Sequence, residues 1–475
     1  MKFITDKLND KFKKVFSNVS YLFLDKLVTL ILGLTVGAWV ARYLGPEKYG
    51  TLNYLLSITT LFSFTVTLGM DSIIIKEISS ESKNSDLVLN TGFLLRIFGS
   101  VIGILIVNVL GFFLGISGEQ RFYLFILSLI LFFQSFKIID LYFRSKISSK
   151  YVVYSHILAL IIISILRVLG IINQLNLTFF ILVVLIQNIL ISLLLFIFYR
   201  KKNNKFYLSK AKREKAINLI KKSWPLLLSS IAVIIYMKVD QIMLGYIASE
   251  KEVGLYNVAV KLSELPYFLS GYIMMSIYPI LVKLYEKNKD KYIENKFFIY
   301  RLMSFLAFSI VVFISPLSEN IVNLIYGDEY LYAAQVMKIH LLSTFWVFNG
   351  LAQSKKNIII GFQKVNMGMT LIGAIVNLIL NFLLIPQYGA IGAAIATVIA
   401  QAVSVNLLTS IIKDTRKDSL YILKNILFYI GLYALIIKFL IPNNLPYFNI
   451  VYMFSIGCIW LYKENDYIKE IVFIK

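Results

Sequence analysis

Ionisable side chains interrupt several long apolar runs, and these are the residues of the chain that could do chemistry. Four of them are carboxylates: Asp25, Asp71, Asp240 and Glu264. A carboxylate in hydrocarbon costs about 2.5–3.5 kcal/mol on insertion scales, so each one needs an explanation. In a medium of low dielectric constant a carboxylate can take up and release a proton near neutral pH. These four are therefore candidates for ion coupling, although a carboxylate that only bonds a neighbouring helix leaves the same pattern.

Basic side chains lie in or beside the same runs. The set is Lys26, Arg42, Arg96, Arg167 and Lys261. A further group, Lys137, Asp140 and Arg144, is spaced i, i+3, i+7, which places all three on one face of a helix. That face either lines a cavity or forms a charge cluster at the inner membrane surface, where long side chains reach the headgroups.

Only a membrane accommodates the elements that carry these residues. The chain has 475 residues, of which 58% are hydrophobic and 16% charged, and its mean hydropathy is +0.76. Repeated apolar runs of about 20 residues predict an all-α polytopic membrane protein. We predict fourteen transmembrane helices, at 17–44, 48–77, 88–114, 120–144, 151–172, 177–199, 223–247, 253–284, 297–325, 333–355, 366–386, 391–412, 420–441 and 447–462.

The formal charge of +22 follows the predicted topology. The segment 200–222 holds ten basic residues and one acidic residue, Glu214. Five short segments on the opposite side hold one basic residue, Lys251, between them: 173–176, 248–253, 326–331, 387–390 and 443–445. This is the positive-inside pattern and not a nucleic-acid footprint, so both termini are expected in the cytoplasm. An even helix count is then required, which twelve helices would also satisfy.

The predicted organisation is a pair of six-helix lobes. We expect an interfacial amphipathic segment at 1–16 with no cleavable signal, an N-lobe at 17–199, a cytoplasmic linker at 200–222, a C-lobe at 223–412, and a helix pair with a tail at 413–475. A shift of 204 positions lays Gly50 on Gly254 and Asn53 on Asn257. Two lobes of equal orientation, related by an axis along the membrane normal, would face a central cavity, which predicts an alternating-access transporter.

One motif joins the end of a helix to the start of the next. Residues 238–262 read KVDQIMLGYIASEKEVGLYNVAVKL, with an Asp-x-x-x-Leu-Gly ending and a Val-Gly-x-Tyr-x-x-Ala beginning, and 248–253 are expected to form the turn. ARYLGP at 41–46 leads to Tyr49-Gly50, which is the analogue of this turn in the first helix pair. IYGDEY at 325–330 forms the turn after the ninth predicted helix, and NLILNFLLIPQYGAIGAAIAT at 377–397 contains the turn between the eleventh and the twelfth. In the last segment Pro386 should stop a helix and Gly389 should turn the chain.

These motifs, in this order, resemble the polysaccharide-lipid flippases of the Wzx type, within the multidrug/oligosaccharidyl-lipid/polysaccharide (MOP, MATE-like) exporter superfamily. The resemblance covers most of the chain. It implies a flippase that moves undecaprenyl-diphosphate-linked repeat units of O-antigen, capsule or exopolysaccharide across the cytoplasmic membrane. On this view Lys26, Arg42, Arg96, Arg167 and Lys261 would contact the diphosphate or the sugars, since cationic side chains neutralise phosphate.

The energy source is left open. The sequence contains no G-x-x-x-x-G-K-[ST] motif, which disfavours an ATP-driven pump. A membrane potential favours outward movement of an anion, and antiport of H⁺ or Na⁺ through Asp25, Asp71, Asp240 or Glu264 is the alternative. No other cofactor is expected. One cysteine, Cys458, and two distant histidines, His156 and His340, give no metal-ligand cluster.

Other functions fit the sequence less well. A flippase for the peptidoglycan precursor lipid II would share the architecture. A cation-coupled multidrug exporter should have an acidic or aromatic cavity, whereas basic residues exceed acidic ones among the candidates. A membrane-embedded transferase, ligase or polymerase generally needs a large external loop, and none is predicted, so we expect no enzyme.

The expected partners are the lipid-linked oligosaccharide, the membrane and the polymerase machinery. No nucleic acid is expected, and the protein is expected to function as a monomer.

Overall fold

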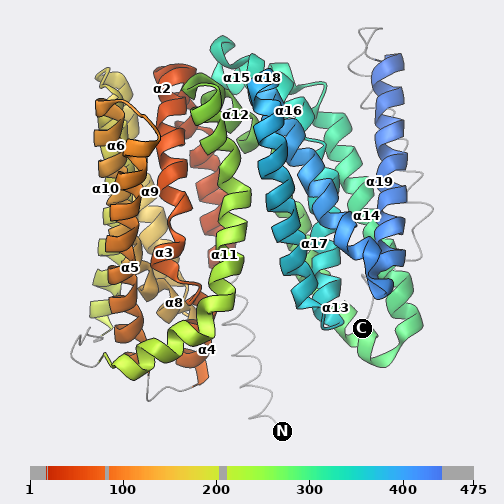
Figure 1. The fold of residues 1–475 in the computed structure, drawn as a ribbon, viewed down its shortest axis with the longest axis horizontal. Coiled ribbons are helices and arrows are strands. Elements are labelled where there is room, and N and C mark those ends of the chain that lie inside the picture. The colour runs from red at the N-terminus through yellow and green to blue at the C-terminus, as the bar shows by residue number, and fades with distance from the viewer. Residues whose placement is uncertain (1–17, 19, 81–84, 203–210, 441–475) are drawn as a thin grey trace. The chain divides into compact units, whose positions relative to one another are not determined.

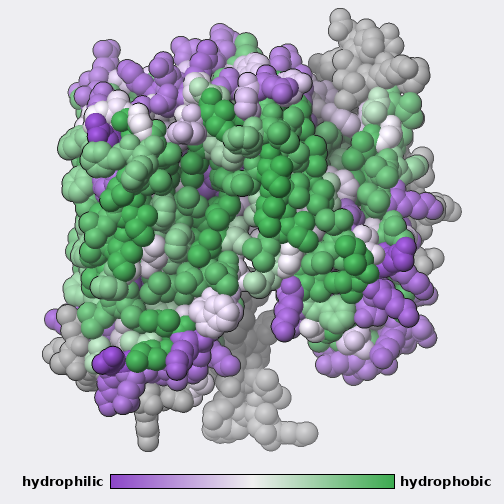
Figure 2. Space-filling model, viewed as in Figure 1, coloured by the Kyte–Doolittle hydropathy of each residue, from purple (hydrophilic) through white to green (hydrophobic). Residues whose placement is uncertain are grey.

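The computed structural model describes residues 18, 20–80, 85–202 and 211–440. These residues form only helices and turns, which confirms the all-α prediction. Nine of their helical stretches are long and apolar enough to cross a membrane. Figure 2 shows apolar side chains along the flanks of the helices and hydrophilic side chains gathered at helix ends, as a multi-pass membrane protein requires.

The chain divides into two compact units, Met1–Tyr246 and Ile247–Lys475. In the first unit residues 20–34 are helical and are followed by a series of helices, most of which are labelled in Figure 1. These elements are α2 (Val36–Leu61), α3 (Phe64–Thr67), α4 (Asp71–Ser80), α5 (Ser85–Phe113), α6 (Gly118–Ser128), α7 (Ile130–Gln134), η2 (Ser135–Lys137), α8 (Ile138–Ser145), α9 (Lys150–Ile172), α10 (Leu177–Lys201) and α11 (Arg213–Ile247).

The second unit is also helical throughout its described part. Its elements are α12 (Glu250–Ser263), α13 (Tyr267–Lys287), α14 (Lys289–Ile314), α15 (Ser318–Tyr326), η4 (Asp328–Tyr330), α16 (Tyr332–His340), α17 (Ser343–Ile359), α18 (Gln363–Ile411) and α19 (Lys413–Leu440). Here α14 packs against α17 and α19, and α12 packs against α16 and α18.

The described residues of the first thirteen predicted spans are mostly helical. The fourteenth, 447–462, and the amphipathic segment 1–16 lie outside the described residues, so the count of fourteen stays a prediction. Several predicted spans are not continuous. The second span is broken between α2 and α4, the fourth is divided into α6, α7, η2 and α8, and the ninth and tenth are each divided in two.

The break in the second span has a clear backbone cause. Leu68 has φ of 49° and Gly69 has φ of 65°, and both values belong to the left-handed region that a right-handed helix cannot include. The apolar pattern continues through this point, so periodicity alone gave no sign of the break. Asp71 therefore begins the half-helix α4 and does not lie inside a continuous helix.

Two of the three helix interruptions that proline or glycine indicates in the sequence are present in the structure. Proline within an apolar run favours a kink, and one is present at Pro266, because α12 ends at Ser263 and α13 begins at Tyr267. The turn at Gly389 is confirmed by its φ of 52°. Pro386, however, does not stop the helix: it lies within α18, and the chain turns three residues later, where glycine permits positive φ.

Along the chain, the boundary between the two compact units falls between Tyr246 and Ile247 and not within the segment 200–222. All of α11 except its last residue, Ile247, belongs to the first unit, where Leu219 is part of a buried core with Ile74, Ile138 and Leu195. Residues 213–222 are helical, and the turn after α11 is shorter than the expected 248–253, since Ser249 already caps α12. The division into two six-helix lobes stays a prediction.

Candidate functional site

A buried arginine and the first residue of a half-helix form the centre of the candidate site. Arg96 lies on α5, and its side chain is 2% exposed. Its Nη2 donates a 2.5 Å hydrogen bond to Oδ1 of Asp71, whose side chain is 52% exposed. The break in the second span places this carboxylate beside α5, because α3 and α4 both pack on that helix. Arg96, which was predicted to contact the substrate, and Asp71, which was predicted to couple to an ion, therefore form an ion pair with each other.

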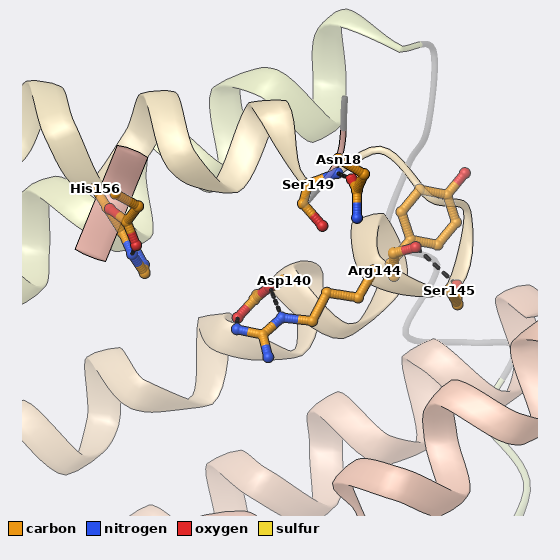
Figure 3. A network of polar contacts seen from close by, with 8 residues as sticks. Asn18, Asp140, Arg144, Ser145, Ser149 and His156 are labelled. Carbon is orange, nitrogen blue, oxygen red and sulfur yellow. Dashed lines mark hydrogen bonds and ion pairs between the residues drawn. The ribbon is translucent and has the colours of Figure 1, made fainter. Parts of the chain in front are cut away.

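A second ion pair lies close to the first. Arg144 donates from Nε and from Nη2 to the two oxygens of Asp140, and both distances are 2.7 Å. Figure 3 shows this fork, with both residues on α8. The pair has the i, i+4 spacing of helix neighbours, so that part of the predicted charged face is confirmed.

Lys137 completes the cluster without a bond to either pair. It lies at the end of the 3₁₀ turn η2, and Asp140 and Arg96 both act on it electrostatically. The sequence had indicated the shared face with Asp140 and Arg144, but not that Arg96 lies nearby. The charge cluster, defined as Asp71, Arg96, Lys137, Asp140 and Arg144, thus holds three cations against two carboxylates.

Asp25 has a different partner. Its Oδ2 lies 3.4 Å from Nδ1 of His156 on α9, while its Oδ1 is buried without a partner among the described residues. Nearby, Oδ1 of Asn18 accepts a 2.8 Å hydrogen bond from the backbone N–H of Ser149, so the first helix is fixed at two places (Figure 3). Sequence reasoning had named Asp25 and His156 but had not brought them together.

The remaining predicted residues are dispersed. Arg167 on α9 is partly buried and donates from Nη2 to Oε1 of Gln187 on α10 at 3.3 Å. Lys26 and Arg42 are exposed in the first unit. In the second unit Lys261 is partly buried near the end of α12, and Glu264 is exposed at the kink. Whether the cations among them contact a substrate stays a prediction.

The first motif packs tightly on α2. Asp240 is 5% exposed, and its neighbour Gln241 accepts a 2.5 Å hydrogen bond from Ser57. A Cβ atom on Gly245 would lie 2.2 Å from the ring of Tyr54, so the glycine of the Leu-Gly ending permits this contact. The motif therefore has a packing role in the first unit.

The structure also brings together charges that sequence reasoning missed. Asp418 at the start of α19 is 1% exposed over the whole residue. Its Oδ1 lies 2.6 Å from Nζ of Lys296 on α14, and its Oδ2 lies 2.9 Å from Nζ of Lys356 on α17. All three residues fall at or beyond the ends of predicted spans, where charges are expected to be solvated, so no sequence pattern indicates that they are buried.

Neutral polar residues form a second buried group in the same unit. Asn381 donates to Asn377 at 3.1 Å, and Oγ1 of Thr397 lies 3.5 Å from Nδ2 of Asn377 and 3.2 Å from the hydroxyl of Tyr256. The i, i+4 spacing of the two asparagines in an apolar run was the signal that could have identified them. Among the described residues no group of three or more His, Cys, Asp or Glu side chains could hold a metal ion.

Comparison with family models gives two matches. The model described as "Polysaccharide biosynthesis protein" matches residues 15–285, which is more than half of the chain. A second model, MatE, matches residues 225–383.

Three curated relatives share 26–29% of aligned residues. An uncharacterized membrane protein of Methanocaldococcus jannaschii is 29% identical over 49% of this chain and 49% of its own length. The probable low-salt glycan biosynthesis flippase Agl15 of Haloferax volcanii is 28% identical over 37% of this chain and 38% of its own. The capsular polysaccharide biosynthesis protein CapF of Staphylococcus aureus is 26% identical over 82% of this chain and 96% of its own. The chain thus spans half or less of the first two relatives.

Solved structures show the same fold. The lipid II flippase MurJ in an inward closed conformation matches with a TM-score of 0.69 and 16% identity, covering 95% of this chain and all of that one. An inward-facing MATE multidrug transporter of the MOP superfamily matches with a TM-score of 0.60 and 17% identity, covering 89% and 99%. The chain therefore belongs to the polysaccharide biosynthesis protein family and has the fold of the MOP-superfamily transporters.

Proposed function

We propose that the protein is a flippase for a lipid-linked oligosaccharide, and more narrowly for repeat units of O-antigen, capsule or exopolysaccharide on undecaprenyl diphosphate. It moves them from the inner to the outer leaflet of the cytoplasmic membrane by alternating access. The family supports a role in polysaccharide biosynthesis, and two relatives are named for glycan flipping and for capsule synthesis.

The observation that carries the proposal is the buried guanidinium of Arg96 within a cluster of net positive charge. A sugar headgroup cannot cross hydrocarbon without losing its hydrogen bonds to water. Its diphosphate needs a cationic partner in a medium of low dielectric constant, and arginine supplies a fork of parallel donors. Arg42, Arg167, Lys26 and Lys261 are proposed as further contacts.

Transport of this kind forms no covalent bond, and both families of structural neighbours are transporters. The proposed driving force is the membrane potential or exchange of H⁺ or Na⁺, with Asp25, Asp71, Asp240 and Glu264 as the coupling carboxylates. Cytoplasmic termini follow from the positive-inside pattern of the loops.

Two alternatives share the fold. Likeness to MurJ fits a lipid II flippase, and the MatE match fits a multidrug exporter. The charge cluster has more cations than carboxylates, which suits an anionic substrate better than a cationic drug.

The test is reconstitution of the full chain in liposomes that contain fluorescent lipid-linked oligosaccharide, with reduction of outer-leaflet fluorescence as the readout. A flippase makes nearly all of the labelled lipid accessible, whereas protein-free liposomes protect the inner half. In the source strain, deletion should abolish surface polysaccharide and cause the lipid-linked units to accumulate. Normal polysaccharide combined with increased sensitivity to cationic dyes would contradict the proposal and favour a drug exporter.

A further inference from the structure

We propose that Arg96 and Lys137 form a phosphate site that Asp71 occupies in this structure, and that an incoming phosphate group displaces Asp71. The inference rests on the proposed function, since it assigns the phosphate to the lipid-linked substrate. The inference adds that the Asp71 carboxylate competes with the substrate for Arg96. Arg96 binds Asp71 when no substrate is present and binds the phosphate when substrate is bound.

The first support is that only one of the two guanidinium nitrogens of Arg96 that could bind a bidentate anion, Nε and Nη2, has a partner among the described residues. Arg144 binds Asp140 through both Nε and Nη2. Arg96 binds Asp71 through Nη2, while its buried Nε has no partner among the described residues. A buried donor without a partner is unfavourable, and a phosphate can accept from Nε and Nη2 at once. Arg96 is thus better matched to a bidentate anion than to the position that Asp71 holds.

The second support is an unpaired cation beside the arginine. Lys137 makes no hydrogen bond or ion pair with any residue in the described part of the chain, yet it is close enough to interact with Arg96 and Asp140. Two cations near one another repel unless an anion lies between them. Asp140 is already bound by Arg144, so it cannot serve Lys137 fully.

The third support is that Asp71 is free to leave. Its side chain is 52% exposed, whereas Arg96 is 2% exposed. It is the first residue of α4 and is separated from the left-handed pair Leu68 and Gly69 only by Met70, and its exposed side chain can rotate away from Arg96 while the backbone stays in place. The first turn of α4 also presents N–H groups that a helix leaves unbonded and that favour an anion.

Displacement changes the charge of the cluster in a useful direction. With Asp71 bound, three cations face two carboxylates; without it, three cations face Asp140 alone. The gain in positive charge is what a phosphate dianion neutralises.

The experiment measures binding of inorganic pyrophosphate to the full chain in nanodiscs of neutral phosphatidylcholine. Asp71→Asn removes the competitor's charge, so the Kd should fall about tenfold, the change that ~1.4 kcal/mol produces. Arg96→Gln should abolish this gain in the double variant Asp71→Asn/Arg96→Gln, and Lys137→Met should reduce it. Glu319→Gln is the matched control, because Glu319 also forms an ion pair, with Lys338, and its side chain is 60% exposed. Its Kd should equal that of the parent chain.

Unchanged or weaker binding in Asp71→Asn would overturn the inference, as would a gain that persists in the double variant. The pyrophosphate Kd of the single variant Asp71→Asn is sufficient to overturn the inference. The test therefore remains possible even if Arg96→Gln fails to fold. The source of the phosphate is resolved by adding polyprenyl diphosphate to the nanodiscs, which should compete with pyrophosphate if the lipid headgroup is the occupant. No competition would leave a site for free phosphate and would contradict the assignment to substrate.

Failure of the inference and of the proposed function can be separated. If the parent chain flips lipid-linked oligosaccharide in liposomes but Asp71→Asn shows no tighter pyrophosphate binding, only the inference fails. If the parent chain flips nothing, the proposed function fails whatever the pyrophosphate result.

Discussion

The backbone of Gly69 lies directly against that of Leu227. A Cβ atom on Gly69 would come within 2.4 Å of the Leu227 nitrogen, closer than any side chain tolerates. Gly69 belongs to the break before α4, and Leu227 follows Pro225 within α11. The break that positions Asp71 is therefore held in place by a helix that begins more than 140 residues later in the chain.

Gly69→Ala should destabilise the first unit for two reasons, left-handed strain and a backbone clash. The strain costs about 1–2 kcal/mol, and overpacking adds roughly 1–3 kcal/mol. Gly115→Ala is the control, because Gly115 has the same φ of 65° but nothing within 4 Å of its Cβ position. Thermal unfolding in detergent should show a larger loss for Gly69→Ala, and equal losses would contradict the backbone contact.

A second close contact joins two of the motifs within the second unit. Oε2 of Glu252 accepts a 2.7 Å hydrogen bond from the backbone N–H of Ala390, and a Cβ atom on Gly389 would lie 2.6 Å from the same oxygen. Glu252→Ala should cost about 1–3 kcal/mol, since it leaves a buried N–H unpaired. Gly389→Ala should also destabilise, but less in the Glu252→Ala background, where the clash is absent. Strictly additive losses in thermal unfolding would refute this coupling.

Features that depend on only a few neighbouring residues could be predicted from the sequence. Apolar runs of the right length gave the spans, Pro266 gave a kink, and Gly389 gave a turn, because each signal acts within a few residues. The break at Leu68 and Gly69 was missed, since leucine at positive φ has no sequence signature and the apolar pattern runs through it.

Pairings between distant residues could not be predicted. Asp71 and Arg96 are 25 residues apart, and periodicity says which face each occupies only if the helix is continuous. Asp418 looked like a solvated residue before a span, yet three helices enclose it. Packing decides which charge pairs with which, so the sequence alone can propose charged candidates but cannot identify their partners.

Asp418→Asn should be among the most destabilising single changes in the second unit. It leaves the ammonium groups of Lys296 and Lys356 buried without their shared carboxylate, and breaking a buried ion pair typically costs about 3–5 kcal/mol. Glu319→Gln breaks a largely exposed pair with Lys338 and should cost at most about 1 kcal/mol. Thermal unfolding of the two variants compares a buried and an exposed carboxylate directly. Similar losses would mean that the cluster at Asp418 is solvated.

Cationic contacts to the substrate predict a transport defect without a loss of protein. Arg42→Ala, Arg167→Ala and Lys261→Ala should each reduce surface polysaccharide while the protein stays in the membrane. A lost charge-assisted hydrogen bond weakens binding by roughly 10- to 100-fold. Lys261→Arg should be milder than Lys261→Ala if charge is what counts. Lys338→Ala is the control, because Lys338 already pairs with Glu319 at 2.7 Å. Normal polysaccharide in all three alanine variants would remove the cationic cavity from the proposed mechanism.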